Sequence, residues 1–336
     1  MEVDSTTHRC EELWFEDGNI VLQAGATQYK VYRGTMARNS PVFHDMLGFP
    51  QPAEAETVEG LPLVKLHDDA EEVTPFLKAL FIVDFFLPFP ARTTYEVLRG
   101  CLRLGQKYAV DSIHKRALVH FSSYFVTSLE SWDFAQYTTQ KADENPSNII
   151  SWTKPESMGP EFYISCILLA REVEATWTLP TSFYHLSTEF KIVGTGPFRA
   201  ADGKIYQLST QDQGAFLRGS EEQMGATWDI VRELGDPEVP KQCPTSPQEC
   251  TFAILNALYE ANDQCRDCQR LPLQFWDYEQ WQYLGHACTR CRFELKQKHN
   301  EARMNFWNDL PMIYELPSWT ELEVMREAAI GDGLLI

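Results

Sequence analysis

The feature that most constrains this sequence is the segment at 19–47, NIVLQAGATQYKVYRGTMARNSPVFHDML, which contains the local signals of four successive elements. Ile20, Val21 and Leu22 form a run rich in β-branched side chains, which pack well on a pleated surface. Gly25 interrupts this run and can take the positive φ of a tight turn. Residues 27–32 then alternate between the two faces of a strand. The pattern predicts a β-hairpin with one buried face.

Two short helices are predicted directly after the hairpin. Residues 33–38 are long enough for one or two helical turns, with Met36 as their apolar anchor. Ser40 is a good N-cap, and Pro41 suits the first helical position because an N–H there has no partner in any case. The apolar residues that follow share one helical face, which we expect to be core: Val42, Phe43, Met46 and Leu47.

This order of elements resembles the BTB/POZ domain, a protein-interaction module. The segment Phe15 to Leu22 is also similar to the start of a large group of fungal BTB proteins, and Leu316-Pro317-x-Trp319 resembles their C-terminal tail. Asn19 departs from the family, because many members have an Asp there that forms a charged partner pocket with a basic residue near Arg33. The core motif that the resemblance implies consists of Ile20, Val21, Leu22, Tyr29, Val31, Arg33, Met36, Ser40, Val42, Phe43 and Met46.

The resemblance and the periodicity together predict an α+β chain. A BTB/POZ domain, with a small mixed sheet and flanking helices, is expected to precede a mainly α-helical C-terminal region. The expected divisions are an acidic tail at 1–12, the BTB/POZ domain at 13–125, a helical extension at 126–235, a Pro-rich hinge at 236–249 and a helical region at 250–336. Within the last region, a helix after Cys291 is expected to end near Trp307, because Pro311 disfavours the α conformation before it.

Two Cys-x2-Cys pairs are the only pattern in the sequence with metal chemistry. Cys265 with Cys268 and Cys288 with Cys291 have the spacing of a four-cysteine zinc site. The sequence therefore makes one structural zinc ion the candidate cofactor. A second interpretation stays open, in which the four thiols pack without metal where two helices meet.

Composition limits the partners and the compartment. The net charge of −19 opposes nonspecific binding to nucleic acid or to anionic membranes, so another protein is the expected partner. No apolar run spans a bilayer and the N-terminus lacks a secretory signal, which predicts a cytoplasmic or nuclear protein, neither secreted nor membrane-bound. There is no room for a long dimerising helix before the first strand, so we expect weak or no homodimerisation.

These observations favour a non-enzymatic adaptor or scaffold that acts through its BTB/POZ domain. The sequence has no hydrolase, metalloprotease or phosphate-binding motif. One alternative is a zinc-dependent nucleic-acid-binding or transcription-related regulator, which would use a local basic run: Arg290, Arg292, Lys296, Lys298 and Arg303. Another is a substrate adaptor for cullin-type ubiquitin ligases, which the weak triplet Pro52-Ala53-Glu54 supports poorly.

Overall fold

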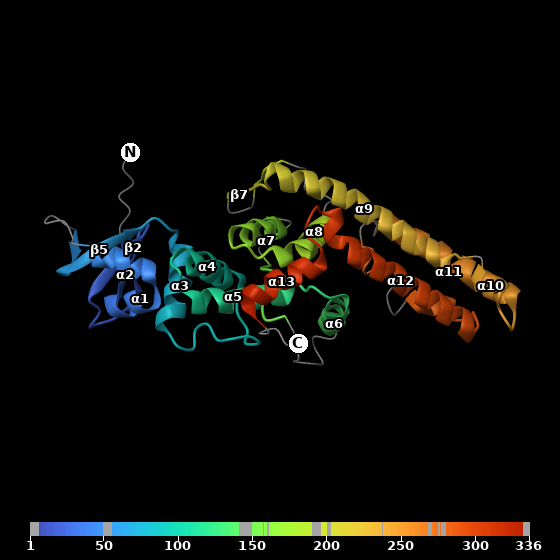
Figure 1. Ribbon diagram of the computed structural model, residues 1–336, viewed down its shortest axis with the longest axis horizontal. Helices are drawn as coiled ribbons and strands as arrows, with labels where there is room; N and C mark the ends of the chain where they lie inside the picture. The colour runs from blue at the N-terminus through green and yellow to red at the C-terminus, as the bar shows by residue number, and fades with distance from the viewer. Residues whose placement is uncertain are drawn as a thin grey trace.

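The computed structural model is elongated, with a sheet at one end and a helical arm at the other (Figure 1). It describes residues 7–49, 56–140, 150–156, 158–159, 161–189, 196–199, 203–236, 238–267, 271–274, 276 and 280–331. Side chains are described for all of these except 136–140, 234, 240, 262, 264–267 and 280. The described residues combine a five-stranded sheet with many helices, which agrees with the predicted α+β class.

The N-terminal sheet is mixed and has the strand order β1-β3-β2-β5-β4. Its antiparallel centre is the predicted hairpin, and Gly25 takes a φ of 55° in the turn. β5 lies parallel to β2, and β1 lies parallel to β3. The strands are β1 (His8–Trp14), β2 (Ile20–Ala24), β3 (Thr27–Val31), β4 (Thr57–Val58) and β5 (Leu61–Leu66).

The edge strand β1 begins at His8, within the segment expected to be an acidic tail. Its side chains are mostly exposed and polar, and only Leu13 is fully buried. The apolar alternation that would announce a strand is therefore missing from the sequence. The strand forms because its backbone pairs with β3, which requires no apolar side chains.

The two short helices after the hairpin are α1 (Arg33–Asn39) and α2 (Pro41–Gly48). The Ser40 hydroxyl accepts from the Phe43 N–H at 2.9 Å and donates to the Tyr108 carbonyl at 2.5 Å. The Phe43 ring is fully buried and stacks on Tyr108, with 4.3 Å between ring centroids. Val42 was predicted to lie on the same buried face, but it is 40% exposed. Successive residues of a helix point about 100° apart, and it is Phe43 that points into the core.

A helical layer joins the sheet to the rest of the chain. It consists of α3 (Ala70–Phe81), α4 (Tyr95–Lys107) and α5 (Asp111–Tyr124). Glu72 of α3 is buried and forms ion pairs with Arg99 at 3.0 Å and with Arg103 at 2.5 Å. Arg103 also pairs with Glu172 of α7 (Glu161–Glu172) at 2.8 Å. The sheet end is therefore tied to the middle of the molecule.

The middle contains a dense aromatic cluster around Trp152, which is fully buried. One hydrophobic core extends from Leu13 in β1 to Ile330, so the last helix returns to the middle of the molecule and packs on α5 (Figure 1). The remaining elements here are α6 (Leu129–Gln140), η1 (Thr176–Thr178), α8 (Leu179–Thr188), β6 (Phe198–Arg199), β7 (Ile205–Tyr206) and α13 (Trp319–Ile330).

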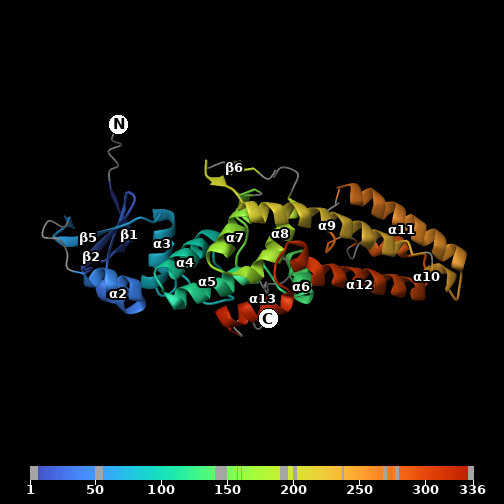
Figure 2. The same cartoon turned by 45° about the horizontal axis from the view of Figure 1, so that its top comes forward.

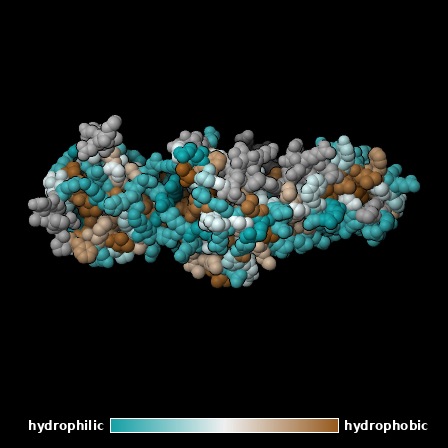
Figure 3. Space-filling model, turned by 90° about the horizontal axis from the view of Figure 1, so that it is seen from above, coloured by the Kyte–Doolittle hydropathy of each residue, from teal (hydrophilic) through white to brown (hydrophobic). Residues whose placement is uncertain are grey.

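The arm is built from long helices that run side by side (Figure 2). They are α9 (Thr210–Leu234), α11 (Pro247–Asp267) and α12 (Thr289–Ile313), with the short α10 (Glu238–Lys241) and η2 (Gln280–Leu284). A separate small core fills the arm and includes Ile230 of α9, Val239 of α10 and Leu295 of α12. The segment 236–249, expected as a hinge, thus joins helices that share one core. Hydrophobic residues also gather on the surface at the far end of the arm (Figure 3).

The prediction that this helix ends before Pro311 is wrong, because α12 continues to Ile313. Proline has no N–H, so the carbonyl of Trp307 lacks its helical partner. The Trp319 indole N–H donates to this carbonyl at 2.7 Å, and the two indole rings stack with 5.1 Å between centroids. The tail after the helix therefore satisfies the group that the proline leaves free.

Candidate metal centre

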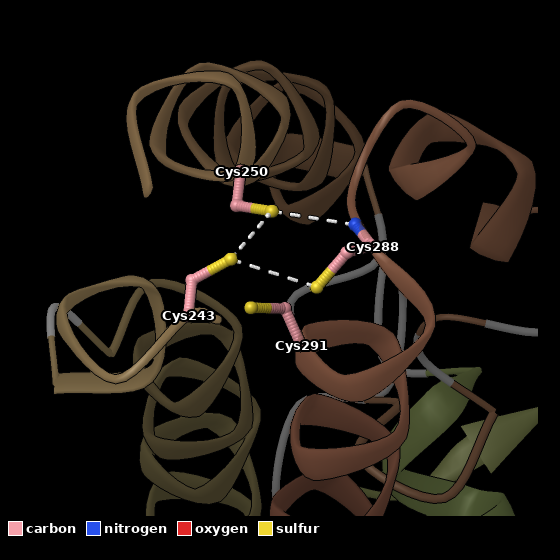
Figure 4. A group of neighbouring side chains, drawn as sticks. All are labelled: Cys243, Cys250, Cys288 and Cys291. Carbon is pink, nitrogen blue, oxygen red and sulfur yellow. Dashed lines mark hydrogen bonds between the residues drawn. The ribbon is translucent and has the colours of Figure 1, made fainter. Parts of the chain in front are cut away.

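Four cysteines come together at the far end of the arm, and their sulfur atoms all lie within 4.8 Å of one another (Figure 4). Cys243 lies in the loop after α10, and Cys250 lies in the first turn of α11. Cys288 is the N-cap of α12, and Cys291 lies in its first turn. Three separate segments thus each contribute at least one sulfur.

The sequence positions explain how helices build this group. Pro247 opens α11 at a position where a missing N–H costs nothing, which puts Cys250 one turn into the helix. Cys288 and Cys291 are three residues apart across the start of α12, a spacing that brings two side chains to the same helix end. Three of the four thiols therefore lie at helix N-termini, where the partial positive charge favours thiolates.

The distances between sulfurs suit a tetrahedral ion. Cys243 Sγ lies 3.5 Å from Cys250 Sγ and 3.6 Å from Cys288 Sγ. In a regular four-sulfur zinc site, with Zn–S bonds of about 2.3 Å, neighbouring sulfurs are about 3.8 Å apart. The Cys288 backbone N–H also donates to Cys250 Sγ at 3.3 Å, a contact that stabilises sulfur carrying negative charge. The four cysteines can therefore hold one metal ion.

The four thiols differ in pKa, which is lowered for two of them and raised for the other two. Hydrogen bonds from the Thr245 side chain and backbone lower the pKa of Cys243 to about 6, and the Cys291 backbone N–H lowers the pKa of Cys288. Burial raises the pKa of Cys250 and of Cys291, which are 1% and 0% exposed. A cation that binds all four sulfurs must displace the protons of the buried pair.

Only half of the sequence-predicted ligand set lies in this group. Cys288 and Cys291 belong to it, but their partners here are Cys243 and Cys250. The backbone of Cys265 lies in α11, about 22 Å beyond Cys250 by the rise of an α-helix. The side chain of Cys265, and Cys268 as a whole, lie outside the described residues.

Cys243 and Cys250 were missed because six residues separate them, so they form no Cys-x2-Cys pair. The prolines around them favoured a hinge instead. One signal was available: Pro247 predicts a helix start, and a cysteine in a first helical turn matches the placement of Cys291.

Most residues of the predicted N-terminal motif form the core beneath the hairpin. Eight of them are at most 2% exposed: Ile20, Val21, Leu22, Tyr29, Val31, Met36, Ser40 and Phe43. Met46 packs against this core from a partly buried position. The Arg33 side chain donates to the Leu47 carbonyl at 2.5 Å, and its backbone N–H donates to Asn19 Oδ1 at 2.8 Å. Asn19 and Arg33 are therefore joined by a helix-starting hydrogen bond rather than by a charged pair.

No helix in the described part of the chain combines the length and the apolar character that crossing a bilayer requires. Searches against protein-family models, curated proteins and solved structures found no match to this chain.

Proposed function

We propose that this chain is a non-enzymatic interaction protein, with a BTB/POZ-type N-terminal domain that binds a protein partner and a helical arm folded around one structural zinc ion. The observation that carries the proposal is the order of elements at the N-terminus. A hairpin, two short helices, a parallel returning strand and a helical layer follow one another as the BTB/POZ resemblance implies.

The N-terminal domain offers a surface suited to a protein partner. Val42, in the first turn of α2, and Phe49, the residue directly after its end, are 40% and 70% exposed. His44 and Asp45 on the same helix are exposed as well. An apolar face with polar neighbours is the usual composition of a protein-binding patch.

The donor set of the arm favours zinc in a structural role. Four thiolates in a tetrahedral arrangement select zinc, or iron in some proteins, over harder cations such as Mg²⁺ and Ca²⁺. A closed set of four protein sulfurs leaves no open position for substrate, which distinguishes structural from catalytic zinc. Bound there, the ion would tie the loop after α10 and the start of α11 to the start of α12.

Nucleic-acid binding by α12 is not favoured, because three of its five basic side chains form ion pairs within the chain. Arg290 pairs with Glu294 at 2.9 Å, and Lys298 pairs with Asp236 at 2.6 Å. Arg303 pairs with Asp133 and is 13% exposed. Phosphate contacts would have to compete with these ion pairs, on a chain of net charge −19.

Affinity purification from the native cell tests the interaction role. We expect a protein to co-purify in stoichiometric amount with the full-length chain and to be lost from the double variant Val42→Asp/Phe49→Asp. The matched control is Val324→Asp/Met325→Asp, which changes two exposed apolar residues of α13 and should retain the partner. If nothing co-purifies above background, or if the α2 variant retains every partner, the proposal fails.

Elemental analysis tests the zinc ion. Protein purified without added metal should contain one zinc ion per chain. The variant Cys243→Ser/Cys288→Ser should lose it, whereas Cys265→Ser/Cys268→Ser should retain it. Metal-free protein with an intact fold would contradict the zinc proposal, and iron in place of zinc would correct the identity of the ion.

A further inference from the structure

Helix α11 has an unusual distribution of side chains. The residues that face the arm are mostly small, with Ala253, Ala257 and Ala261 at most 3% exposed. Ile254 is buried with them, but three larger or equally large apolar residues face solvent: Phe252 is 74% exposed, Leu255 58% and Tyr259 71%. A helix stabilised only by packing in its own chain would bury its large side chains and expose its alanines.

The three exposed side chains form one stripe. They recur at positions i, i+3 and i+7, so they lie on one face over two helical turns. From their exposed fractions, the stripe offers roughly 400 Å² of apolar surface. This is about half of the ~800 Å² that one partner contributes to a standard protein interface, and it lies in the range of about 300–600 Å² that the largest apolar patch of a monomer covers, a patch that is often functional.

The charge along α11 is mostly negative. Residues 247–267 contain Glu249, Glu260, Asp263 and Asp267 and one basic residue, Arg266, whose side chain lies outside the described ones. Glu249 and Asp263 are exposed, and Glu260 is half-buried. The nearest cations of α10 and α9 are neutralised locally, since Lys241 pairs with Glu238 and Arg232 pairs with Asp229.

This charge pattern favours a basic helix of another protein over a second copy of this chain as the binding partner. In a second copy of the chain, the same acidic residues would meet one another across the contact, which like-charge repulsion opposes. A helix with an apolar face and basic flanks would bury the stripe and pair with the carboxylates at the same time.

We propose that the exposed face of α11 docks a basic amphipathic helix of a partner protein, with Phe252, Leu255 and Tyr259 as its anchors. This inference rests on the proposed metal centre, because Cys250 fixes the first turn of α11 directly before Phe252. It adds a second binding surface, at the opposite end of the molecule from α2 (Figure 1).

The test uses the full-length chain and a fluorescent synthetic peptide. The probe is a helix of about 18 residues with leucines on one face and lysines on the other, long enough to cover the stripe. Its control has glutamate at every lysine position. We expect the lysine peptide to bind at least about tenfold more tightly than the glutamate peptide, with the preference reduced as salt is raised.

Substitutions in α11 test whether the lysine peptide binds at the stripe. Phe252→Ser/Leu255→Ser/Tyr259→Ser should weaken lysine-peptide binding at least about tenfold. Glu260→Gln/Asp263→Asn should weaken it less and should reduce its salt dependence. Equal binding of the two peptides, or unchanged binding by the triple variant, would overturn the proposal. So would a stable dimer in light scattering that the triple variant abolishes, because the occupant would then be a second copy.

Zinc content and thermal melting are measured on every sample. If the wild-type chain contains zinc and is stably folded but does not bind the lysine peptide, only the docking surface is refuted. A wild-type chain without zinc refutes the metal centre, and the two failures are thus distinguishable.

Discussion

The substitution Gly219→Ala tests how closely α9 and α12 pack. Gly219 lies inside α9, where alanine is intrinsically more favourable than glycine by about 1 kcal/mol. A Cβ at this position would lie 2.2 Å from Cε1 and 2.3 Å from Cδ1 of Tyr314. Carbon atoms in favourable contact are about 3.5–4.0 Å apart, so one of the two groups must move.

Tyr314 has little freedom to move. It is fully buried and stacks on Phe183 with 5.1 Å between ring centroids. Its hydroxyl donates a hydrogen bond to Gln223 Oε1 at 2.7 Å. Overpacking costs about 1–3 kcal/mol, and a displaced buried hydroxyl adds about 1–3 kcal/mol. After the propensity gain of about 1 kcal/mol, we expect a net destabilisation of about 1–5 kcal/mol.

Gly225→Ala is the matched control, because it lies in the same helix with nothing within 4 Å of its added Cβ. It should stabilise the chain by about 0.5–1 kcal/mol. Urea titration followed by far-UV circular dichroism measures both variants through their midpoints. The reasoning is refuted if Gly219→Ala is as stable as wild type or if both variants shift in the same direction.

Three further changes have defined outcomes. Phe43→Ala should cost about 3–5 kcal/mol in denaturant titration because it leaves a cavity against Tyr108, whereas Val42→Ala, at an exposed site, should stay within about 0.5 kcal/mol. Trp319→Phe should cost about 1–3 kcal/mol in the same assay, because it leaves the Trp307 carbonyl unpaired; an unchanged midpoint would refute that role. Burial lowers the pKa of His185 to about 4, so the unfolded chain takes up its proton first as pH falls. Stability should therefore be lost between about pH 6.5 and 4, by at most about 3 kcal/mol, and His185→Phe should flatten this part of the profile.

Local signals predicted the elements whose boundaries are set by nearest neighbours in the chain. Ser40 caps α2 as predicted, through a side chain that accepts from the backbone N–H three residues on. The hairpin was predictable for the same reason, since its turn and its alternation lie within one short segment. Signals of this kind depend only on residues a few positions apart.

Features that depend on distant partners could not be predicted. Helix α12 passes Pro311 because Trp319, beyond the end of the helix, pairs with the freed carbonyl. β1 forms because β3 lies beside it, although its side chains carry no strand pattern. The spacing rule for cysteines found Cys288 and Cys291 but not Cys243 and Cys250, because only tertiary packing brings the start of α11 next to the start of α12.

The most direct test of the metal centre is X-ray absorption at the zinc edge on the full-length chain as purified. We predict a single shell of four sulfur atoms at about 2.3 Å, unchanged in Cys265→Ser/Cys268→Ser and lost with the zinc in Cys243→Ser/Cys288→Ser. A shell with nitrogen or oxygen ligands, or one that changes when Cys265 and Cys268 are replaced, would contradict the assignment of Cys243, Cys250, Cys288 and Cys291 as the ligands.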